Sequence, residues 1–181
     1  MFSREDGARG SQVSSDFISI ENLVVVKKQN AATDMAALIV PAVGSNYERH
    51  PKLQRFMLAN DSTTIAVEVP VWLAAGDIAA LQKQYGIRLF SDSAPAGERE
   101  RVITGHIDFI QVRNGAVHIL DYKPDARTNK PIAQLTVYAL ALARLTGLNL
   151  FDIKCAWFNE NEYCEFFPRT LLAQRKRNPA S

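Results

Sequence analysis

The sequence predicts an α/β domain, with a mixed central β-sheet flanked by helices. Segments with strand and helix patterns alternate along the 181 residues in the order β, α, β, α, β-hairpin, α, β-hairpin. Asn114-Gly115 separates two apolar, β-branched runs, and a type I′ hairpin turn needs positive φ at two such residues. Hydrophobic residues make up 47% of the chain, which suffices for one core. We therefore expect one domain built on one mixed sheet.

Composition sets the expected domain limits. Residues 1–17 begin with small and polar side chains and predict a disordered start. A single domain is expected over residues 18–172, followed by a loose basic tail over 173–181 that contains Arg175-Lys176-Arg177. No repeat of 20 to 50 residues interrupts this organisation.

Turn and capping residues set the expected limits of each element. Pro51 suits the first turn of a helix, and Asp77 is a good N-cap. Gly86 and Gly147 each follow an expected helix end. In chain order, we expect a strand at 18–26, an ambiguous segment at 34–40, a helix at 51–58, a strand at 63–73, a helix at 77–85, a loop at 91–99, a hairpin at 105–123, a helix at 131–145 and a hairpin at 152–167.

Charge and cysteine content exclude some function classes. The net charge of +2 and the pI of about 8.6 are compatible with a polyanionic partner but do not indicate one. Cys155 and Cys164 cannot supply the four thiolates of an iron–sulfur cluster, so we expect no such cluster and two reduced core thiols. No apolar run has the length of a membrane span, and residues 1–20 lack a signal-peptide pattern. We expect a cytoplasmic protein without membrane contact.

The hairpin places two aspartates opposite each other. If Asn114-Gly115 forms the turn, Asp108 faces Asp121, at a Cβ separation of about 5 Å. The repulsion between them is relieved either by a raised pKa of one carboxyl group or by a divalent cation between them. Lys123 and His106 share this sheet face. A second Asp-x-Lys triplet, at residues 152–154, has no facing acid and is interpreted as structural.

Four further residues are weaker candidates when each is taken alone. Glu68 interrupts an apolar strand and either faces solvent at an edge or points into a site; Pro70 favours an edge strand. His50 precedes an expected helix and is either a capping group or a ligand. Gln134 and Tyr138 are spaced i, i+4 and share one helix face, where they form either an amphipathic pair or part of a site.

Taken together, these motifs resemble the PD-(D/E)XK nuclease superfamily in its RecB-like branch. Gly105 to Asp108 matches Gly-x-x-Asp, Asp121 to Lys123 matches Asp-x-Lys, and Gln134 to Tyr138 matches Gln-x-x-x-Tyr. Glu68 and His50 match an acid on an earlier strand and a histidine on the helix before it. The order and spacing agree over roughly residues 47–168, although His50 is followed directly by proline.

The resemblance implies a restriction-endonuclease-like core and Mg²⁺- or Mn²⁺-dependent hydrolysis of DNA in repair, recombination or defence. It implies Asp108, Asp121, Glu68 and His50 as metal ligands and Lys123 as a catalytic cation. It also implies that Gln134 and Tyr138 position the substrate, and that a separate helicase or other repair protein is a partner. One alternative is a non-catalytic nucleic-acid-binding or assembly module on the same fold. Another is a structural domain with solvated carboxylates, which would bind no divalent metal.

Overall fold

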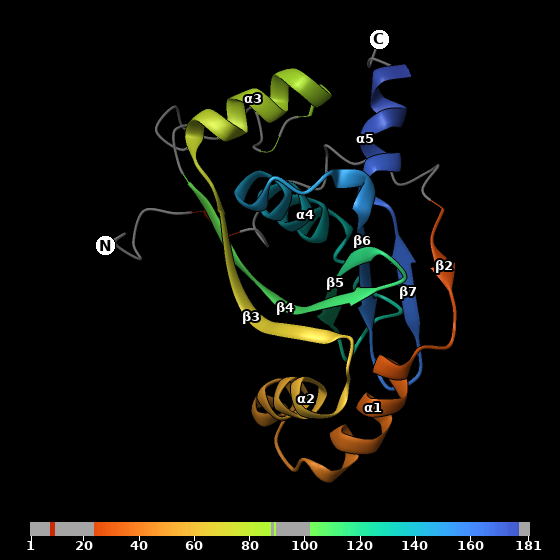
Figure 1. The fold of residues 1–181 in the computed structure, drawn as a ribbon. Helices are drawn as coiled ribbons and strands as arrows, with labels where there is room; N and C mark the ends of the chain where they lie inside the picture. Colours follow the sequence, from red (N-terminus) through yellow and green to blue (C-terminus); the bar gives the residue numbers. More distant parts are fainter. Residues whose placement is uncertain (1–7, 10–23, 88, 90–101, 178–181) are drawn as a thin grey trace.

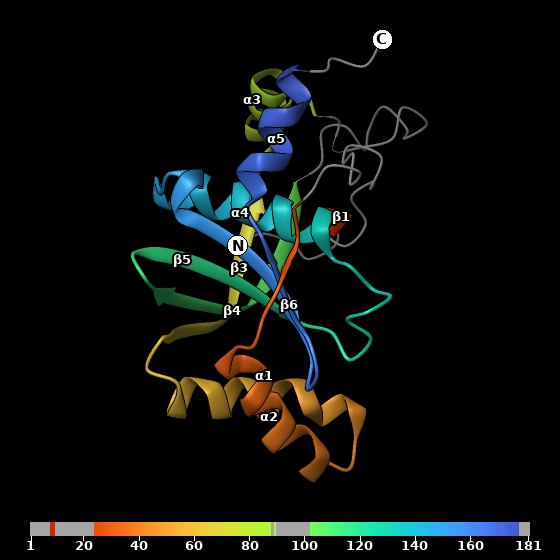
Figure 2. The same ribbon diagram turned by 90° about the vertical axis from the view of Figure 1, so that its right-hand side faces the viewer.

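The computed structural model describes residues 8–9, 24–87, 89 and 102–177, and its fold is a mixed sheet between two helical layers. Helices α1 and α2 lie on one side of the sheet, and α4 lies on the other, next to α3 and α5 (Figures 1 and 2). The described strands form one seven-stranded sheet in the order β1-β4-β5-β6-β7-β2, with β3 paired to β4 alone. The predicted fold class is confirmed.

The described elements have the following bounds. The strands are β1 (Ala8–Arg9), β2 (Val26–Lys27), β3 (Thr64–Leu73), β4 (Ile103–Arg113), β5 (Ala116–Tyr122), β6 (Ile153–Phe158) and β7 (Tyr163–Phe166). The α-helices are α1 (Ala31–Ile39), α2 (Asn46–Asn60), α3 (Ala75–Tyr85), α4 (Ile132–Thr146) and α5 (Pro168–Arg177). Two 3₁₀ turns are η4 (Val40–Ala42) and η6 (Leu150–Asp152). No helix among the described residues is both long enough and apolar enough to cross a bilayer.

Two hydrophobic clusters fix the layers. The α2 cluster joins α1 and α2 to one face of the sheet and consists of Ala32, Ala36, Val40, Leu53, Met57, Phe109, Leu120, Tyr122, Ala156, Phe158 and Tyr163. The larger α4 cluster covers the other face and includes Val71, Leu73, Ile103, Ile107, Ile110, Ile119, Leu135, Tyr138 and Trp157. Both predicted core thiols, Cys155 and Cys164, are buried and free.

The predicted hairpin forms with the predicted register. Asn114 and Gly115 have φ of 52° and 72°, which is the left-handed backbone that a type I′ turn requires. Arg113 pairs with Ala116, and the pairing continues to Phe109 opposite Leu120. Asp108 and Asp121 occupy the next position on each strand, immediately beyond the last registered pair. The turn therefore brings the two acids to the point where the ladder between β4 and β5 ends.

Several predicted helix limits were wrong. Helix α2 begins at Asn46, five residues before the predicted start, and Pro51 lies inside it. Helix α3 begins after Ala74, so Asp77 lies in its first turn, where its carboxylate accepts the Ala74 N–H at 3.3 Å instead of serving as the N-cap residue. Both residues suit the first turns of a helix generally, so residue type alone did not fix the exact position. The ambiguous segment 34–40 lies in α1 and η4.

The chain ends also differ from expectation. Of the segment 1–17, only Ala8–Arg9 is described, and it pairs in parallel with β4 as strand β1. The strand expected at 18–26 is described only from residue 24, and its observed part is Val26–Lys27. The backbone of 173–177 continues helix α5, where a loose tail was expected. The expected loop at 91–99 lies outside the described residues.

His118, predicted to be structural, supports a prediction about acid stability. Its ring is 2% exposed, and its Nδ1 accepts the Arg113 Nε–H at 3.3 Å. Burial, together with the nearby cations of Arg113 and Lys154, lowers the pKa of His118 to about 4. An unfolded histidine titrates near 6.5, so the unfolded chain binds more protons between these values and stability falls as the pH is lowered through this window.

We expect His118 to account for about 2 kcal/mol of the stability lost between pH 7.5 and pH 4.5. Urea unfolding of the wild type and of His118→Gln at both values measures this contribution. The variant should show the smaller loss. Equal losses in the two proteins would mean that His118 does not control this transition.

Candidate metal centre

The site lies where strands β3 and β4 both change the face that they present to the two helical layers. Ile107 and Ile110 pack in the same α4 cluster although they are three residues apart, while Phe109 belongs to the α2 cluster. Strict alternation would place Ile107 and Ile110 on opposite faces of the sheet. On β3, Ala66 and Val69 both pack against the α4 cluster in the same way. The break in alternation falls at Glu68 on β3 and Asp108 on β4.

Glu68 makes this change possible through its backbone. It has φ of 52°, a left-handed conformation that costs a non-glycine residue roughly 1–2 kcal/mol. The neighbouring pairs Val67–Phe109 and Val69–Ile107 place Glu68 and Asp108 opposite each other. As predicted from Pro70, β3 is an edge strand in the described sheet. The left-handed backbone of Glu68 therefore turns its carboxylate toward Asp108.

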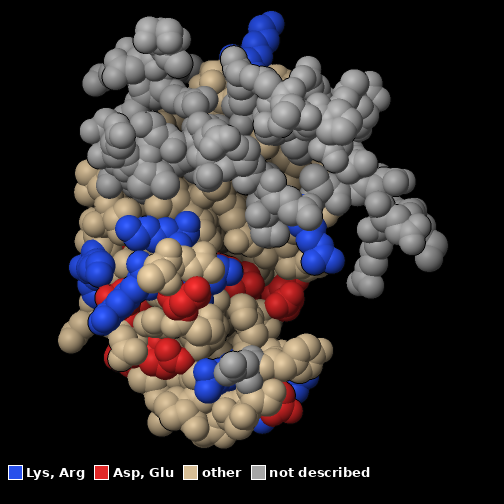
Figure 3. Space-filling model, turned by 180° about the vertical axis from the view of Figure 1, so that it is seen from behind, with Lys and Arg blue, Asp and Glu red and all other residues tan. Residues whose placement is uncertain are grey.

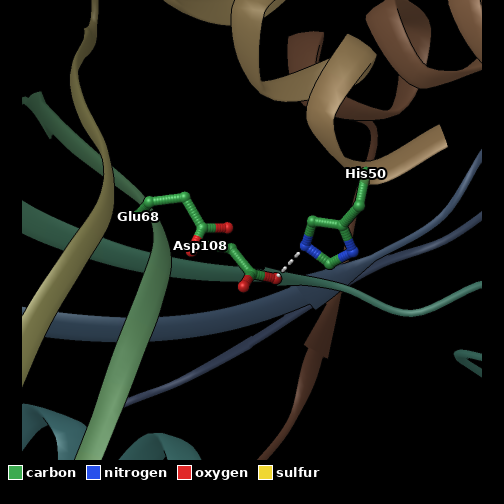
Figure 4. A group of neighbouring side chains, drawn as sticks. All are labelled: His50, Glu68 and Asp108. Carbon is green, nitrogen blue, oxygen red and sulfur yellow. Dashed lines mark ion pairs between the residues drawn. The ribbon is translucent and has the colours of Figure 1, made fainter. Parts of the chain in front are cut away.

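Three of the four predicted metal ligands come together. The ligand atoms of His50, Glu68 and Asp108 all lie within 4.8 Å of one another, from α2, β3 and β4 (Figure 4). His50 Nε2 lies 2.7 Å from Asp108 Oδ2, and the same oxygen accepts the Tyr122 N–H at 3.0 Å. The ring of His50 also makes an edge contact with the Tyr122 ring, at 5.6 Å between centroids. An imidazole and two carboxylates form a donor set that suits a divalent cation.

Negative charge concentrates at this trio. Burial lowers the pKa of His50, but the carboxylates of Asp108, Asp121 and Glu68 outweigh it and raise the pKa above its usual 6.5. The three acids thus favour the cationic form of the imidazole when no metal is bound. A bound divalent cation would take over this role, because it requires the neutral imidazole.

Asp121 lies outside the trio and pairs with Lys123. Lys123 Nζ lies 2.9 Å from Asp121 Oδ2, and the two side chains are 22% and 7% exposed. Burial and the Asp108 carboxylate raise the pKa of Asp121 to about 7, against the opposing effect of Lys123. Burial alone would lower the pKa of Lys123, but Asp121 and Asp108 raise it, so the ammonium stays charged. Asp121 and Lys123 therefore form an ion pair beside the three candidate metal ligands.

The Gln-x-x-x-Tyr motif, at residues 134–138, reaches the site from helix α4. Gln134 Nε2 donates to the Tyr138 hydroxyl at 3.0 Å. A Cβ on Gly105 would overlap the Tyr138 ring, so the ring lies directly on the backbone of β4 three residues before Asp108. Burial raises the pKa of Tyr138, and the carboxylates of Asp121 and Asp108 add to the effect. Gly105 is thus the residue that allows Tyr138 to pack beside both acids.

One sequence expectation fails here, and one supporting residue was missed. His106 was expected on the same face as both Asp108 and Ile110, but the change of face at Asp108 separates them: Ile110 joins Ile107 in the α4 cluster, while the exposed His106 lies on the opposite face. Gln54 was not predicted, although it is only 4% exposed and its Nε2 donates to Glu68 Oε1. Its spacing of four residues from His50 on α2 was the available signal.

The comparison with known families agrees with this arrangement. A family model of the PD-(D/E)XK nuclease superfamily matches residues 25–165, which is most of the chain and contains every residue of the site. The chain belongs to the PD-(D/E)XK nuclease superfamily. Members of this superfamily generally use divalent metals, and His50, Glu68 and Asp108 of this nuclease-superfamily domain form a candidate site for one.

The other comparisons add little. No curated protein matches the sequence significantly. Among solved structures, the crystal structure of SSO0001 is 14% identical in sequence, with 85% of this chain and 79% of that chain covered. Its TM-score is 0.35, too low for an argument about this PD-(D/E)XK domain.

Proposed function

We propose that this chain is a nuclease that hydrolyses DNA phosphodiester bonds with Mg²⁺ or Mn²⁺. The observation that carries the proposal is the convergence of three sequence motifs at one place. Asp108, Asp121 and Lys123 are all present, whereas a binding or assembly module on this fold needs none of them. The buried carboxyl group of Asp121 and the left-handed backbone of Glu68 both cost stability, which favours a chemical role for this part of the sheet.

The residues divide into metal ligands and groups that act on the substrate. His50, Glu68 and Asp108 would hold the metal, with Asp121 as a further carboxylate that acts electrostatically on Asp108 and His50. When bound, the metal supplies a nucleophilic water at neutral pH and offsets negative charge on the phosphate. Gln54 orients Glu68, and the Tyr122 N–H orients Asp108. These contacts hold the ligand oxygens in place before the metal arrives.

Lys123 is proposed as the catalytic cation. Asp121 keeps it protonated and holds its ammonium group beside the metal ligands. A fixed positive charge at this position would stabilise the negative charge that develops on the phosphate in the transition state. Gln134 and Tyr138 would position the substrate backbone, since their hydrogen-bonded side chains lie against β4 next to the acids.

The finer assignment follows from the motif pattern of Gly-x-x-Asp, Asp-x-Lys and Gln-x-x-x-Tyr. We propose that the chain belongs to the RecB-like branch and acts in the cytoplasm, in DNA repair, recombination or defence. A separate helicase or another repair protein is the proposed partner, in line with this branch.

Cleavage of end-labelled DNA tests the proposal. Single- and double-stranded substrates, linear and circular, are incubated with Mg²⁺, with Mn²⁺ or with EDTA. We expect cutting that requires metal, and the circular substrates separate endonuclease from exonuclease activity. Calorimetric titration with Mn²⁺ separates the remaining cases: metal binding without cutting of any substrate would favour the non-catalytic module. Absence of both cutting and metal binding would leave a structural domain.

A further inference from the structure

An exposed row of side chains leads away from the metal centre along β3 and β4. Pro70 and Trp72 follow Glu68 on β3, and His106 and Thr104 precede Asp108 on β4. Pro70 pairs with His106, and Trp72 pairs with Thr104, so the four form two adjacent cross-strand pairs. All four are exposed, and Trp72 is 45% exposed. An indole left in solvent on a regular strand is not explained by the core.

This row shares a sheet face with the metal ligands. The intervening residues Val71, Leu73, Ile103 and Ile107 pack in the α4 cluster on the opposite face. By strand alternation, Trp72 and His106 therefore point to the side of the sheet where α2 carries His50 and Gln54. Helix α2 packs on the other half of these strands, through Leu53 and Met57 against Phe109. The far half of the strand pair is thus a continuation of the site.

We propose that Trp72 and His106 form a stacking surface for unpaired bases of a DNA single strand whose phosphate lies at the metal centre. The inference rests on the proposed nuclease function and names the form of its substrate. Four residues of extended strand place Trp72 about 13 Å from Glu68 along the sheet. Indole and imidazole rings stack on any base, whereas a duplex hides the faces of its bases. A single strand can therefore use this surface, and a duplex cannot.

The distribution of charge on the described surface favours base stacking, rather than attraction to phosphates, as the source of affinity for a DNA strand. Lys27 and Arg127 both pair with Glu162, and Lys28 pairs with Glu165. On the face shown in Figure 3, basic and acidic atoms alternate in a band across the described surface and form no large basic patch. With a net charge of only +2, non-specific attraction to phosphates is weak. The exposed aromatic rings are then the better source of affinity for a strand.

Binding of oligo(dT) with Ca²⁺ in place of Mg²⁺ tests the proposal. We expect Trp72→Ala to weaken binding of a labelled single strand about tenfold, with a smaller effect for His106→Ala and partial rescue by Trp72→Phe. Binding of a blunt duplex should not change. Trp157, the only other tryptophan, is 1% exposed, so the quenching of tryptophan fluorescence by oligo(dT) should disappear in Trp72→Phe. Phe151→Ala, which removes another exposed ring on η6, is the matched control and should bind normally.

The outcomes separate this inference from the proposed function. A wild type that cuts DNA, with unchanged oligo(dT) binding and fluorescence quenching in the Trp72 variants, would overturn the stacking surface alone. Binding of oligo(dT) through Trp72 without cutting of any substrate would keep the surface and remove the nuclease proposal. If Trp72→Ala does not fold by circular dichroism, Trp72→Phe and His106→Ala still decide the case. Normal fluorescence quenching in Trp72→Phe and normal oligo(dT) affinity in His106→Ala would contradict the proposal.

Discussion

Asp121→Asn is expected to lower metal-dependent DNA cleavage by about 10³-fold or more, while its free energy of unfolding stays within about 1 kcal/mol of wild type. The two effects separate because burial and Asp108 already raise the pKa of Asp121 to about 7. An amide of the same shape resembles the protonated acid that the metal-free fold tolerates. It also removes the repulsion with Asp108, which offsets the lost ion pair with Lys123. It cannot, however, supply the charge that holds the catalytic cation and attracts a metal.

Lys123→Met separates the role of Lys123 in catalysis from the role of Asp121 in metal binding. We expect cleavage to fall by about 10²- to 10³-fold, because the fixed positive charge beside the phosphate is lost. Metal affinity should stay the same or rise, since a cation next to the ligands has been removed. Asp121→Asn should instead weaken Mn²⁺ binding. Cleavage kinetics, calorimetry with Mn²⁺ and urea unfolding on the same preparations measure the three quantities.

The chain contains its own control for this experiment. Asp152 and Lys154 form a second Asp-x-Lys triplet, in which Asp152 is exposed and Lys154 lies over the ring of Phe167. Asp152→Asn and Lys154→Met should retain full cleavage. Full activity of Asp121→Asn, or global unfolding of this variant, would instead assign the Asp121–Lys123 pair a purely structural role.

Local chemistry explains which parts of the site were predictable. Asn114-Gly115 fixed the register of the hairpin, because few residue pairs adopt positive φ twice. The i, i+4 spacing likewise placed Gln134 and Tyr138 on one helix face, where they form a hydrogen bond. Each of these depends on neighbours within a few residues along the chain.

The parts that failed depend on long-range contacts. Nothing in the local sequence indicates that Glu68 adopts a left-handed backbone, because glutamate has no preference for it. Its conformation follows from the pairing of β3 with β4 and from Gln54 on α2. The resulting change of face separated His106 from Ile110, with which it was predicted to share a face. It also brought His50 and Glu68 to Asp108, which the strand pattern alone could not establish.

Gly105→Ala is expected to lower the free energy of unfolding by about 1–3 kcal/mol, because the added methyl group would clash with the Tyr138 ring. The new methyl group would overlap the Tyr138 ring, which is 6% exposed and tethered to Gln134, so the ring cannot move without losing its packing. Cleavage should fall as well, because Tyr138 lies beside Asp108 and Asp121. Urea unfolding and cleavage rates measure both effects.

Gly76→Ala in α3 is the matched control. Nothing lies within 4 Å of the added Cβ, and an alanine in a helix is expected to stabilise the protein by about 0.5–1 kcal/mol relative to glycine.

A double-mutant cycle identifies the contact as the cause. In a Tyr138→Ala background the ring is absent, so Gly105→Ala should cost almost nothing, and the coupling free energy should equal most of the single-mutant cost. An undiminished cost in that background would mean that the strand needs glycine for its own backbone. Coupling would instead show that the glycine of Gly-x-x-Asp and the tyrosine of Gln-x-x-x-Tyr act as one unit. The glycine would then give the ring room, and the ring would hold the strand that carries Asp108.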